Sequence, residues 1–556
     1  MNAGTGHHAN SSFELRENNV SSLVEKNGAL YPDKTAVKWV SSETCKNWRD
    51  YLPIPHESIT YKAFAERSAR LARGLKNAGI GKGDRVIILL PISLELYLAL
   101  GALMRIGATA VFLDVGAKEQ LDASAHQTEP KALIGAETIF ATVPMLNAIP
   151  LKIVVGPHSA KCCVEFSILR ETEDDTPIEP VFPDAPALIT YTTGSSGVPK
   201  GIVRTHAFLV AQHNALTQCI PYLETDIDLP TFPIFLLNNL ACGIASVLPA
   251  INLAVPSERD APMLTGQMRS EEVTCCTFAP GLLARVTEYC QRHRIELPHL
   301  RRVVTGGAPT DKDIVRMLKT VAPQAAVFVI YGSTEAEPIS LIEADELLRD
   351  TSVGKGVNVG TIVRELKYKF IKIHRGDIEL DDQGWQKWMI PEGELGELVV
   401  SGPHVCQDYY KNPAAFKRNK IKDAHGRVWH RTGDVGLLDE SNRLWIAGRV
   451  HNVILREKTY LFPLHAETLL KTLGFVNQAA YVGIDDETLG ERTCVTISLR
   501  RGFGVENPMH YLGQIHALFK MHELPVDEIR IFDDIPMDSR HHSKVDYGKL
   551  KKMLGG

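Results

Sequence analysis

The segment from Tyr191 to Gly201 combines the residue types that bind a phosphate group. Hydroxyl residues and glycines are interleaved in it, and a lysine lies near its end. Glycines let the backbone turn its N–H groups toward an anion, hydroxyls add donors, and the lysine adds a positive charge. The residues concerned are Thr192, Thr193, Gly194, Ser195, Ser196, Gly197 and Lys200. Any shorter fragment of this run would indicate only a glycine–serine turn between strands.

The order of these residues excludes the phosphate loop of nucleotide kinases and ATPases. That loop needs glycine directly before the lysine and Ser or Thr directly after it, but Pro199 and Gly201 stand there. The run Thr192–Gly201 instead resembles the phosphate loop of adenylate-forming enzymes, which include acyl-CoA synthetases, luciferases and peptide-synthetase adenylation domains. The resemblance implies an enzyme that uses ATP and Mg²⁺ to convert a carboxylic acid into its acyl-adenylate, with release of pyrophosphate.

Two further segments match this family in order and spacing. Gly306–Pro309 resembles its adenine-contacting turn, and Tyr331–Glu335 resembles its Tyr-Gly-x-Thr-Glu motif. A lone carboxylate beside a triphosphate would repel it unless a hard cation bridges the two. The resemblance implies adenine contacts for Gly307, Ala308, Pro309, Tyr331 and Gly332, a phosphate contact for Thr334, and Mg²⁺ binding for Glu335.

The remaining motif residues lie in the last quarter of the chain. Asp434, in an Arg-Thr-Gly-Asp motif, offers paired acceptors that suit the ribose diol. The resemblance implies that Arg449 is a second ribose or phosphate contact. It also implies that Lys544 is the catalytic lysine, which acts on the α-phosphate and the substrate carboxylate. Without the other family motifs, Asp434 would be interpreted as a turn cap, and Lys544 as a solvated lysine of a basic tail.

The residues that contact the acyl group are the hardest to identify from the sequence. Phe232, Phe235, Asn238 and Gly306 are candidate substrate contacts by their place in the family pattern, although such side chains are equally consistent with core. No acidic residue lies between Phe232 and Leu240 to bind an amino group, which disfavours amino-acid substrates. His206 is interpreted as a structural histidine.

The acceptor of the acyl group stays open. Members of the family that transfer to a thiol carry Asp or Lys where this chain has His451, and Gly where it has Lys458. Thr231–Phe235 and Arg540–Lys544 resemble the olefin-pathway β-lactone synthetases, which adenylate a 3-hydroxy fatty acid and close a lactone without a second substrate. A fatty or 3-hydroxy fatty acid and lactone closure are therefore favoured. The alternatives are a thioester ligase for CoA or a carrier protein, an amide-forming ligase, and a degenerate nucleotide- or acyl-binding protein without turnover.

The elements that must position these residues follow a strand–loop–helix rhythm. Strand, helix and strand are expected at 86–90, 94–106 and 110–113, which form a βαβ unit. Further strands are expected at 151–155, 187–191, 273–278, 302–304 and 326–330, and helices at 281–292 and 311–320. Ligands bind beyond the carboxyl ends of strands in such α/β folds.

A small antiparallel β region is expected from residue 393, and a separate α+β unit after about residue 448. We therefore expect an α/β protein with a large adenylating domain of stacked sheets, residues 1–447. A small mobile α+β domain, residues 448–556, carries Lys544, and its closure should gate the first reaction step.

The composition is that of an ordinary cytosolic protein. The formal charge of −5 and the pI of about 6.5 come without runs of basic residues, which argues against nucleic acid as a partner. The ten cysteines show no Cys-x-x-Cys pair and read as reduced thiols. The N-terminal 20 residues lack a signal-peptide core, and the apolar stretch at 86–115 is interrupted by Pro, Glu, Arg and Gly. We expect no transmembrane segment.

Overall fold

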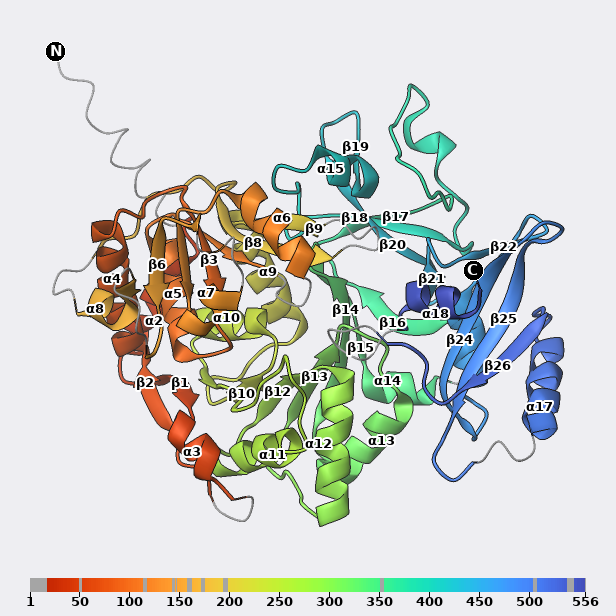
Figure 1. The fold of residues 1–556 in the computed structure, drawn as a ribbon, viewed down its shortest axis with the longest axis horizontal. Helices are drawn as coiled ribbons and strands as arrows, with labels where there is room; N and C mark the ends of the chain where they lie inside the picture. Colours follow the sequence, from red (N-terminus) through yellow and green to blue (C-terminus); the bar gives the residue numbers. More distant parts are fainter. Residues whose placement is uncertain are drawn as a thin grey trace.

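The protein is described by a computed structural model. It covers residues 18–49, 53–113, 118–142, 146, 148–157, 163–171, 176–193, 199–350, 355–503, 508–537 and 545–555. Figure 1 shows an α/β protein built on three sheets. This agrees with the predicted fold class.

The first sheet has seven strands and follows the predicted βαβ rhythm. Strands β3 and β4 pair in parallel and are joined by α5 (Leu94–Arg105), so the predicted βαβ unit is confirmed. Only the last pair, β8 and β9, is antiparallel. In sheet order the strands are β7 (Val164–Glu165), β6 (Leu151–Val154), β5 (Ala132–Gly135), β3 (Arg85–Leu89), β4 (Thr109–Phe112), β8 (Pro186–Thr193) and β9 (Pro199–Thr205).

The second sheet has fourteen strands and changes character midway. From β1 to β14 its strands pair mainly in parallel. In sheet order this part is β2 (Glu57–Thr60), β1 (Thr35–Trp39), β11 (Ala245–Val247), β10 (Ile227–Pro230), β12 (Cys275–Phe278), β13 (Arg302–Gly306) and β14 (Ala326–Ser333).

From β14 onward the same sheet is antiparallel, which confirms the predicted small β region. It continues through β15 (Ala336–Glu343), β16 (Val357–Ile362), β21 (Leu444–Arg449), β20 (Val428–Leu438), β18 (Gly396–Ser401) and β17 (Lys367–Ile371), with β19 (Lys420–Lys422) paired to β20.

Amphipathic helices cover the sheets. In α13 (Lys312–Val321) the side chains of Val315, Leu318 and Val321 recur at helical spacing and are buried, and Asp311 caps the first turn. The helix predicted at 281–292 is α12 (Pro280–His293). The other helices of the first two sheets are α2 (Ser21–Leu30), α3 (Ser42–Asn47), α4 (Tyr61–Asn77), α6 (Lys118–Thr128), α7 (Glu137–Thr142), α8 (Phe166–Arg170), α9 (His206–Cys219), α10 (Pro233–Cys242), α11 (Asp260–Ser270), α14 (Ala344–Arg349) and α15 (Pro413–Asn419).

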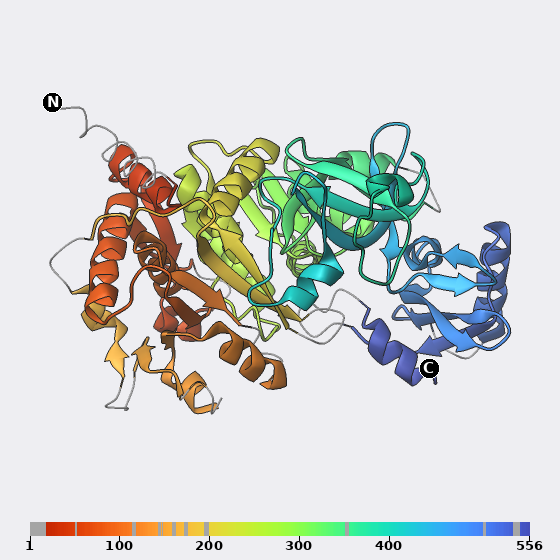
Figure 2. The same cartoon turned by 90° about the horizontal axis from the view of Figure 1, so that it is seen from above.

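The last part of the chain forms its own five-stranded sheet. Its strands are β23 (Thr459–Leu461), β22 (Ile454–Arg456), β25 (Gly490–Leu499), β24 (Val476–Asp486) and β26 (Glu528–Phe532), with helices α16 (Pro463–Leu470), α17 (Pro508–Met521) and α18 (Tyr547–Met553). In Figure 2 it lies at the opposite end of the molecule from the seven-stranded sheet. The predicted boundary near residue 448 falls within β21 and stays a prediction. Within the described ranges, no helix has the length and apolarity needed to cross a membrane.

Candidate active site

The hairpin of β8 and β9 presents the glycine-rich segment. Its register pairs Thr192 with Lys200 and Thr193 with Pro199, so Lys200 stands at the base of the connecting loop. Gly194, Ser195, Ser196, Gly197 and the side chain of Thr193 lie outside the described residues, as does Lys544. The predicted roles of these residues therefore stay predictions.

Lys200 joins this hairpin to the turn between β14 and β15. Its Nζ lies 3.5 Å from Oε1 of Glu335, a carboxylate that is only 8% exposed. Arg204, further along β9, donates from Nη2 to the carbonyl of Thr334 at 3.1 Å. The two sheets thus meet at Thr334 and Glu335, which the sequence predicts as phosphate and metal contacts.

Glu335 is ionised because basic groups surround it. Burial alone would raise its pKa, but His430, Lys200 and Lys420 outweigh burial and lower the pKa to about 2. Burial lowers the pKa of His430 to about 3, so this imidazole is neutral near pH 7. His430 therefore carries charge only at the acid pH where Glu335 titrates, and near pH 7 Lys200 and Lys420 are the positive groups of this set.

A single buried carboxylate suits Mg²⁺, which keeps several waters and binds proteins through one or two carboxylates plus substrate phosphates. Within the described residues, no group of three or more His, Cys, Asp or Glu side chains is arranged to hold a metal ion. Glu335, with Thr334 beside it, therefore fits a Mg²⁺ ion held jointly with phosphate. A dedicated protein cage would need more ligands.

Tyr331, Asp434 and Arg449 form a second cluster close to the first. The Tyr331 hydroxyl donates to Oδ2 of Asp434 at 2.6 Å, and Arg449 Nη1 donates to Oδ1 at 3.0 Å. Burial and the Asp434 carboxylate raise the pKa of Tyr331 well above 10, so its hydroxyl keeps its proton. Asp434 and Arg449 are register partners on β20 and β21, which explains how residues 15 positions apart meet.

The turn after β13 lies beside Tyr331 because β13 and β14 are parallel neighbours. Gly306 is paired with Ile330, and a Cβ on Gly306 would lie 2.4 Å from the Ile330 carbonyl oxygen. Gly307 has φ +81°, which favours glycine. Ala308, Pro309 and Gly332 belong to the same pair of strand ends. The predicted adenine-contacting residues are thus brought together.

The tentative substrate residues separate into different environments. Phe232 lies near Gly307, at 4.0 Å from its Cβ position, and Phe235 is buried in a core cluster with Val304 and Ile330. Asn238 is hydrogen-bonded to His213 Nδ1 at 2.9 Å. Phe235 is therefore core rather than an exposed wall, whereas Phe232 faces the adenine turn.

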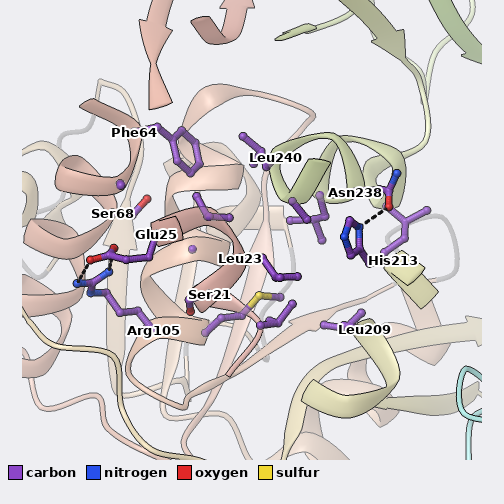
Figure 3. A pocket seen from close by; sticks show the side chains of 18 of the residues that line it. Ser21, Leu23, Glu25, Phe64, Ser68, Arg105, Leu209, His213, Asn238 and Leu240 are labelled. Atoms are coloured by element: carbon purple, nitrogen blue, oxygen red, sulfur yellow. Dashed lines mark hydrogen bonds and ion pairs between the residues drawn. The ribbon is translucent and has the colours of Figure 1, made fainter. Parts of the chain in front are cut away.

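Asn238 and His213 line a narrow apolar cavity between α2, α4, α5, α9 and α10. Figure 3 shows this cavity with the Arg105–Glu25 ion pair at one end and the His213–Asn238 pair at the other. Gln212, another lining residue, donates from Nε2 to the carbonyl of Glu337 at 3.1 Å. The cavity is thus one side chain away from the turn that carries Glu335.

Sequence reasoning missed Tyr409 and Lys420 as members of the site. The Tyr409 hydroxyl donates to Oε1 of Glu335 at 3.1 Å. Lys420 follows Lys417, Arg418 and Asn419 in the sequence and looks like one more solvated lysine. It is 1% exposed. Only the strand pairing of β19 with β20 could have revealed its place.

The two residues that bear on a thiol acceptor lie beyond β21. His451 and Lys458 are both exposed, and Lys458 occupies the tip of the β22–β23 hairpin with φ +68°. A lysine here adopts the left-handed conformation that glycine takes without strain.

The relatives of this chain are ligases and synthetases. The olefin beta-lactone synthetase of Stenotrophomonas maltophilia is 28% identical over 554 residues, which cover 96% of this chain and 97% of the relative. That of Xanthomonas campestris is 28% identical, with 96% of each chain covered. A 4-coumarate–CoA ligase of Oryza sativa is 25% identical over 78% of this chain and 77% of the relative.

Solved structures share the fold. The amide bond synthetase McbA of Marinactinospora thermotolerans superposes with a TM-score of 0.77 at 22% identity, with 96% of this chain and 100% of that chain covered. ATP-bound MatB of Rhodopseudomonas palustris gives 0.76 at 20% identity, covering 96% and 99%. The sequence pattern of the AMP-binding enzyme family matches residues 24–410, more than half of the chain. With the site residues gathered at the strand ends, this match establishes that the chain belongs to the AMP-binding enzyme family.

Proposed function

We propose that this enzyme adenylates a carboxylic acid with ATP and Mg²⁺, and that its preferred substrate is a 3-hydroxy fatty acid. The observation that carries the first part is the contact of Lys200 with Glu335 beside the Tyr331–Asp434–Arg449 cluster. One cluster suits phosphate and a cation, and the other suits a ribose diol. A nucleoside triphosphate is the ligand that carries both groups.

In the first step a carboxylate oxygen attacks the α-phosphorus in line. The bond from the α-phosphorus to the bridging oxygen breaks, and pyrophosphate leaves with the electron pair. Negative charge grows on the phosphoryl oxygens, so fixed positive groups such as Lys200 lower the barrier. Mg²⁺ on Glu335 would neutralise charge on the phosphates. Lys544 is assigned to the α-phosphate and the substrate carboxylate.

The cavity of Figure 3 supports a substrate with a linear alkyl chain. Its walls include Leu23, Phe64, Leu209 and Leu237, and its volume is about 60 Å³. Its apolar lining suits an alkyl chain, and at this volume the surrounding helices would have to move apart to admit a long one. Ligand sites are typically apolar with a few placed polar groups.

One polar atom of the cavity supports a hydroxyl group on the substrate. The Oε1 atom of Gln212 is buried and has no hydrogen-bond partner within the described part of the chain. An unsatisfied buried acceptor is costly, so a ligand hydroxyl that donates to it would be favoured. Gln212 also donates from Nε2 to the carbonyl of Glu337, so its side chain links the cavity to the strand that follows Glu335.

Lactone closure would follow without a second substrate. The 3-hydroxyl oxygen attacks the acyl carbon of the mixed anhydride, its proton is lost, and AMP leaves as the four-membered ring forms. Intramolecular attack gains from proximity. The names of the relatives from Stenotrophomonas and Xanthomonas agree with this product.

The test incubates the enzyme with ATP, Mg²⁺ and a 3-hydroxy fatty acid, without and with CoA, and identifies the products by mass. We expect a β-lactone and AMP without CoA. The same acid without the 3-hydroxyl is the control and should give pyrophosphate and acyl-adenylate only. A thioester formed only when CoA is present would instead favour the CoA-ligase alternative, as in the 4-coumarate–CoA ligase relatives. No pyrophosphate from any acid would favour a binding protein without turnover.

A further inference from the structure

Lys420 is a fully buried lysine on the short strand β19. Its side chain is 1% exposed, whereas Lys422, two positions along the same strand, is exposed. Residues two positions apart on a strand point to the same face, so the two lysines share a face and only its Lys420 end is covered by the rest of the protein. Lys420 pairs in register with His430 of β20, whose buried imidazole also lies near Glu335.

The ammonium group of Lys420 is tied to the segment that holds Glu335. Lys420 Nζ donates to the Cys406 carbonyl oxygen, and the Cys406 N–H donates to the Glu335 carbonyl oxygen at 2.7 Å. Three residues further, the Tyr409 hydroxyl donates to Oε1 of Glu335 at 3.1 Å. The short segment Cys406–Tyr409 therefore holds Glu335 at both its backbone and its carboxylate, and Lys420 anchors that segment.

Two ammonium groups flank the same aromatic ring. Nζ of Lys420 lies 5.2 Å and Nζ of Lys200 lies 5.3 Å from the centroid of Tyr409. Within the described residues, Lys420 has no carboxylate oxygen within ion-pair distance, and Lys200 pairs with Glu335. Two lysines thus face Glu335, and the Asp408 carboxylate, in the same segment as Tyr409, also acts on Lys420.

Burying an ammonium without an ion-pair partner has a large desolvation cost. Packing alone gives no reason for it, because an apolar side chain would fill the same space without that cost. A role in binding an anion does give a reason. The attraction between the buried ammonium and a bound polyphosphate would offset the desolvation cost. Electrostatic interactions are also stronger inside a protein than in water.

We propose that Lys420 is a positioning residue for the triphosphate of ATP. It acts through the Cys406–Tyr409 segment, which fixes Glu335, and it adds a buried positive charge behind Lys200. This role rests on the proposed function, because it assumes that ATP binds at Glu335. It predicts that Lys420 favours a triphosphate over a monophosphate of the same nucleoside.

The test measures Mg-ATP and AMP binding by calorimetry for the full-length enzyme and its variants, with no acid substrate required. Lys420→Met should weaken Mg-ATP binding by about tenfold or more, as expected for the loss of one nearby charge at low effective dielectric. AMP binding should change far less, because AMP lacks the β- and γ-phosphates. Lys420→Arg, which keeps the charge, should restore Mg-ATP binding, and Lys422→Met is the matched control at the exposed end of β19.

A purely structural lysine would give a different pattern. Equal losses for Mg-ATP and AMP, or unchanged Mg-ATP binding in Lys420→Met, would overturn the proposal. If Lys420→Met fails to fold, Tyr409→Phe replaces it, and it should weaken Mg-ATP binding selectively; equal or absent effects there overturn the proposal as well. A wild-type enzyme that binds neither nucleotide would refute the proposed function itself.

Discussion

At the scale of single residues, the site contains two buried carboxylates in opposite settings. Glu335 lies among basic groups, and Lys200 and Tyr409 both contact its Oε1 atom. Asp434 has both of its oxygens engaged by donors, Tyr331 and Arg449. The first setting leaves a net positive site for phosphate, and the second fixes a carboxylate in one orientation. Different substitutions should therefore affect different parts of the nucleotide.

Asp434→Asn should weaken ATP and AMP binding by a similar factor. An amide keeps one acceptor oxygen but turns an NH₂ donor toward either the Tyr331 hydroxyl or the Arg449 guanidinium. Loss of hydrogen bonds to a charged group predicts about a 10- to 100-fold loss of affinity, measured by calorimetry. A loss confined to ATP would place Asp434 near the phosphates and contradict the ribose assignment.

His206 should make folding stability depend on acid pH. It is fully buried, its Nδ1 accepts from the Val20 N–H at 3.2 Å, and burial lowers its pKa from 6.5 to about 4. Below pH 6.5 the unfolded chain takes up this proton first, so stability is lost as pH falls from 6.5 through 4. Each such group contributes a slope of about 1.4 kcal/mol per pH unit.

His206→Asn removes this proton and keeps an acceptor for the Val20 N–H. Its free energy of unfolding, measured with denaturant, should fall less steeply than that of wild type between pH 6 and pH 4. The same substitution at the exposed His425 controls for the loss of a histidine. An unchanged slope in His206→Asn would contradict the neutral, buried state. The sequence already favoured a structural histidine here.

At the scale of elements, the parallel pair β13 and β14 sets the adenine side of the site. Gly306 faces the backbone of β14, and a Cβ there would meet the Ile330 carbonyl oxygen at 2.4 Å. Gly307 has a left-handed φ, but the nearest atom to its Cβ position is Phe232 Cζ at 4.0 Å. The two neighbouring glycines are therefore required for different reasons, one steric and one conformational.

Gly306→Ala should damage the protein more than Gly307→Ala. A backbone carbonyl in a strand pair cannot move without moving the strand, so the new Cβ of Gly306→Ala must push β13 away from β14. This should lower the free energy of unfolding by about 3 kcal/mol or more. Gly307→Ala adds only the strain of a positive φ, which should lower the free energy of unfolding by about 1 kcal/mol. Thermal unfolding and AMP affinity, measured for both variants, should show the larger loss in Gly306→Ala. Equal effects would contradict the close approach of the two strands.

The sequence predicts single helices and strands better than it predicts the contacts between elements that are distant in sequence. The βαβ unit at β3–α5–β4 and the helices α12 and α13 were predicted because hydrophobic periodicity is local. The four motifs that converge on Glu335 and Asp434 were found through the family resemblance. Lys420 was missed because its burial depends on the pairing of β19 with β20, and its neighbours in sequence are basic and polar. A local pattern carries no information on such pairing.

At the scale of the whole molecule, the C-terminal sheet lies at the far end from the seven-stranded sheet (Figure 2). Its β22–β23 hairpin has a two-residue turn, Glu457–Lys458, with φ of +48° and +68°. Such turns favour Asn-Gly because both residues need positive φ. The Lys458 side chain is exposed at this tip, and the proposed turning of the C-terminal sheet would bring it to a thiol arm.

Lys458→Gly should therefore have two separable effects. Relief of left-handed strain should stabilise the protein by about 1 kcal/mol, measured by denaturant unfolding. Removal of the side chain should also let CoA reach the acyl-adenylate, so that thioester appears where the proposed wild-type reaction gives none. Glu457→Gly is the matched control, because it relieves similar strain and leaves Lys458 in place. It should stabilise the hairpin without admitting CoA. If both variants form thioester, flexibility of the hairpin rather than loss of the Lys458 side chain admits CoA. If neither variant forms thioester, Lys458 does not exclude the thiol.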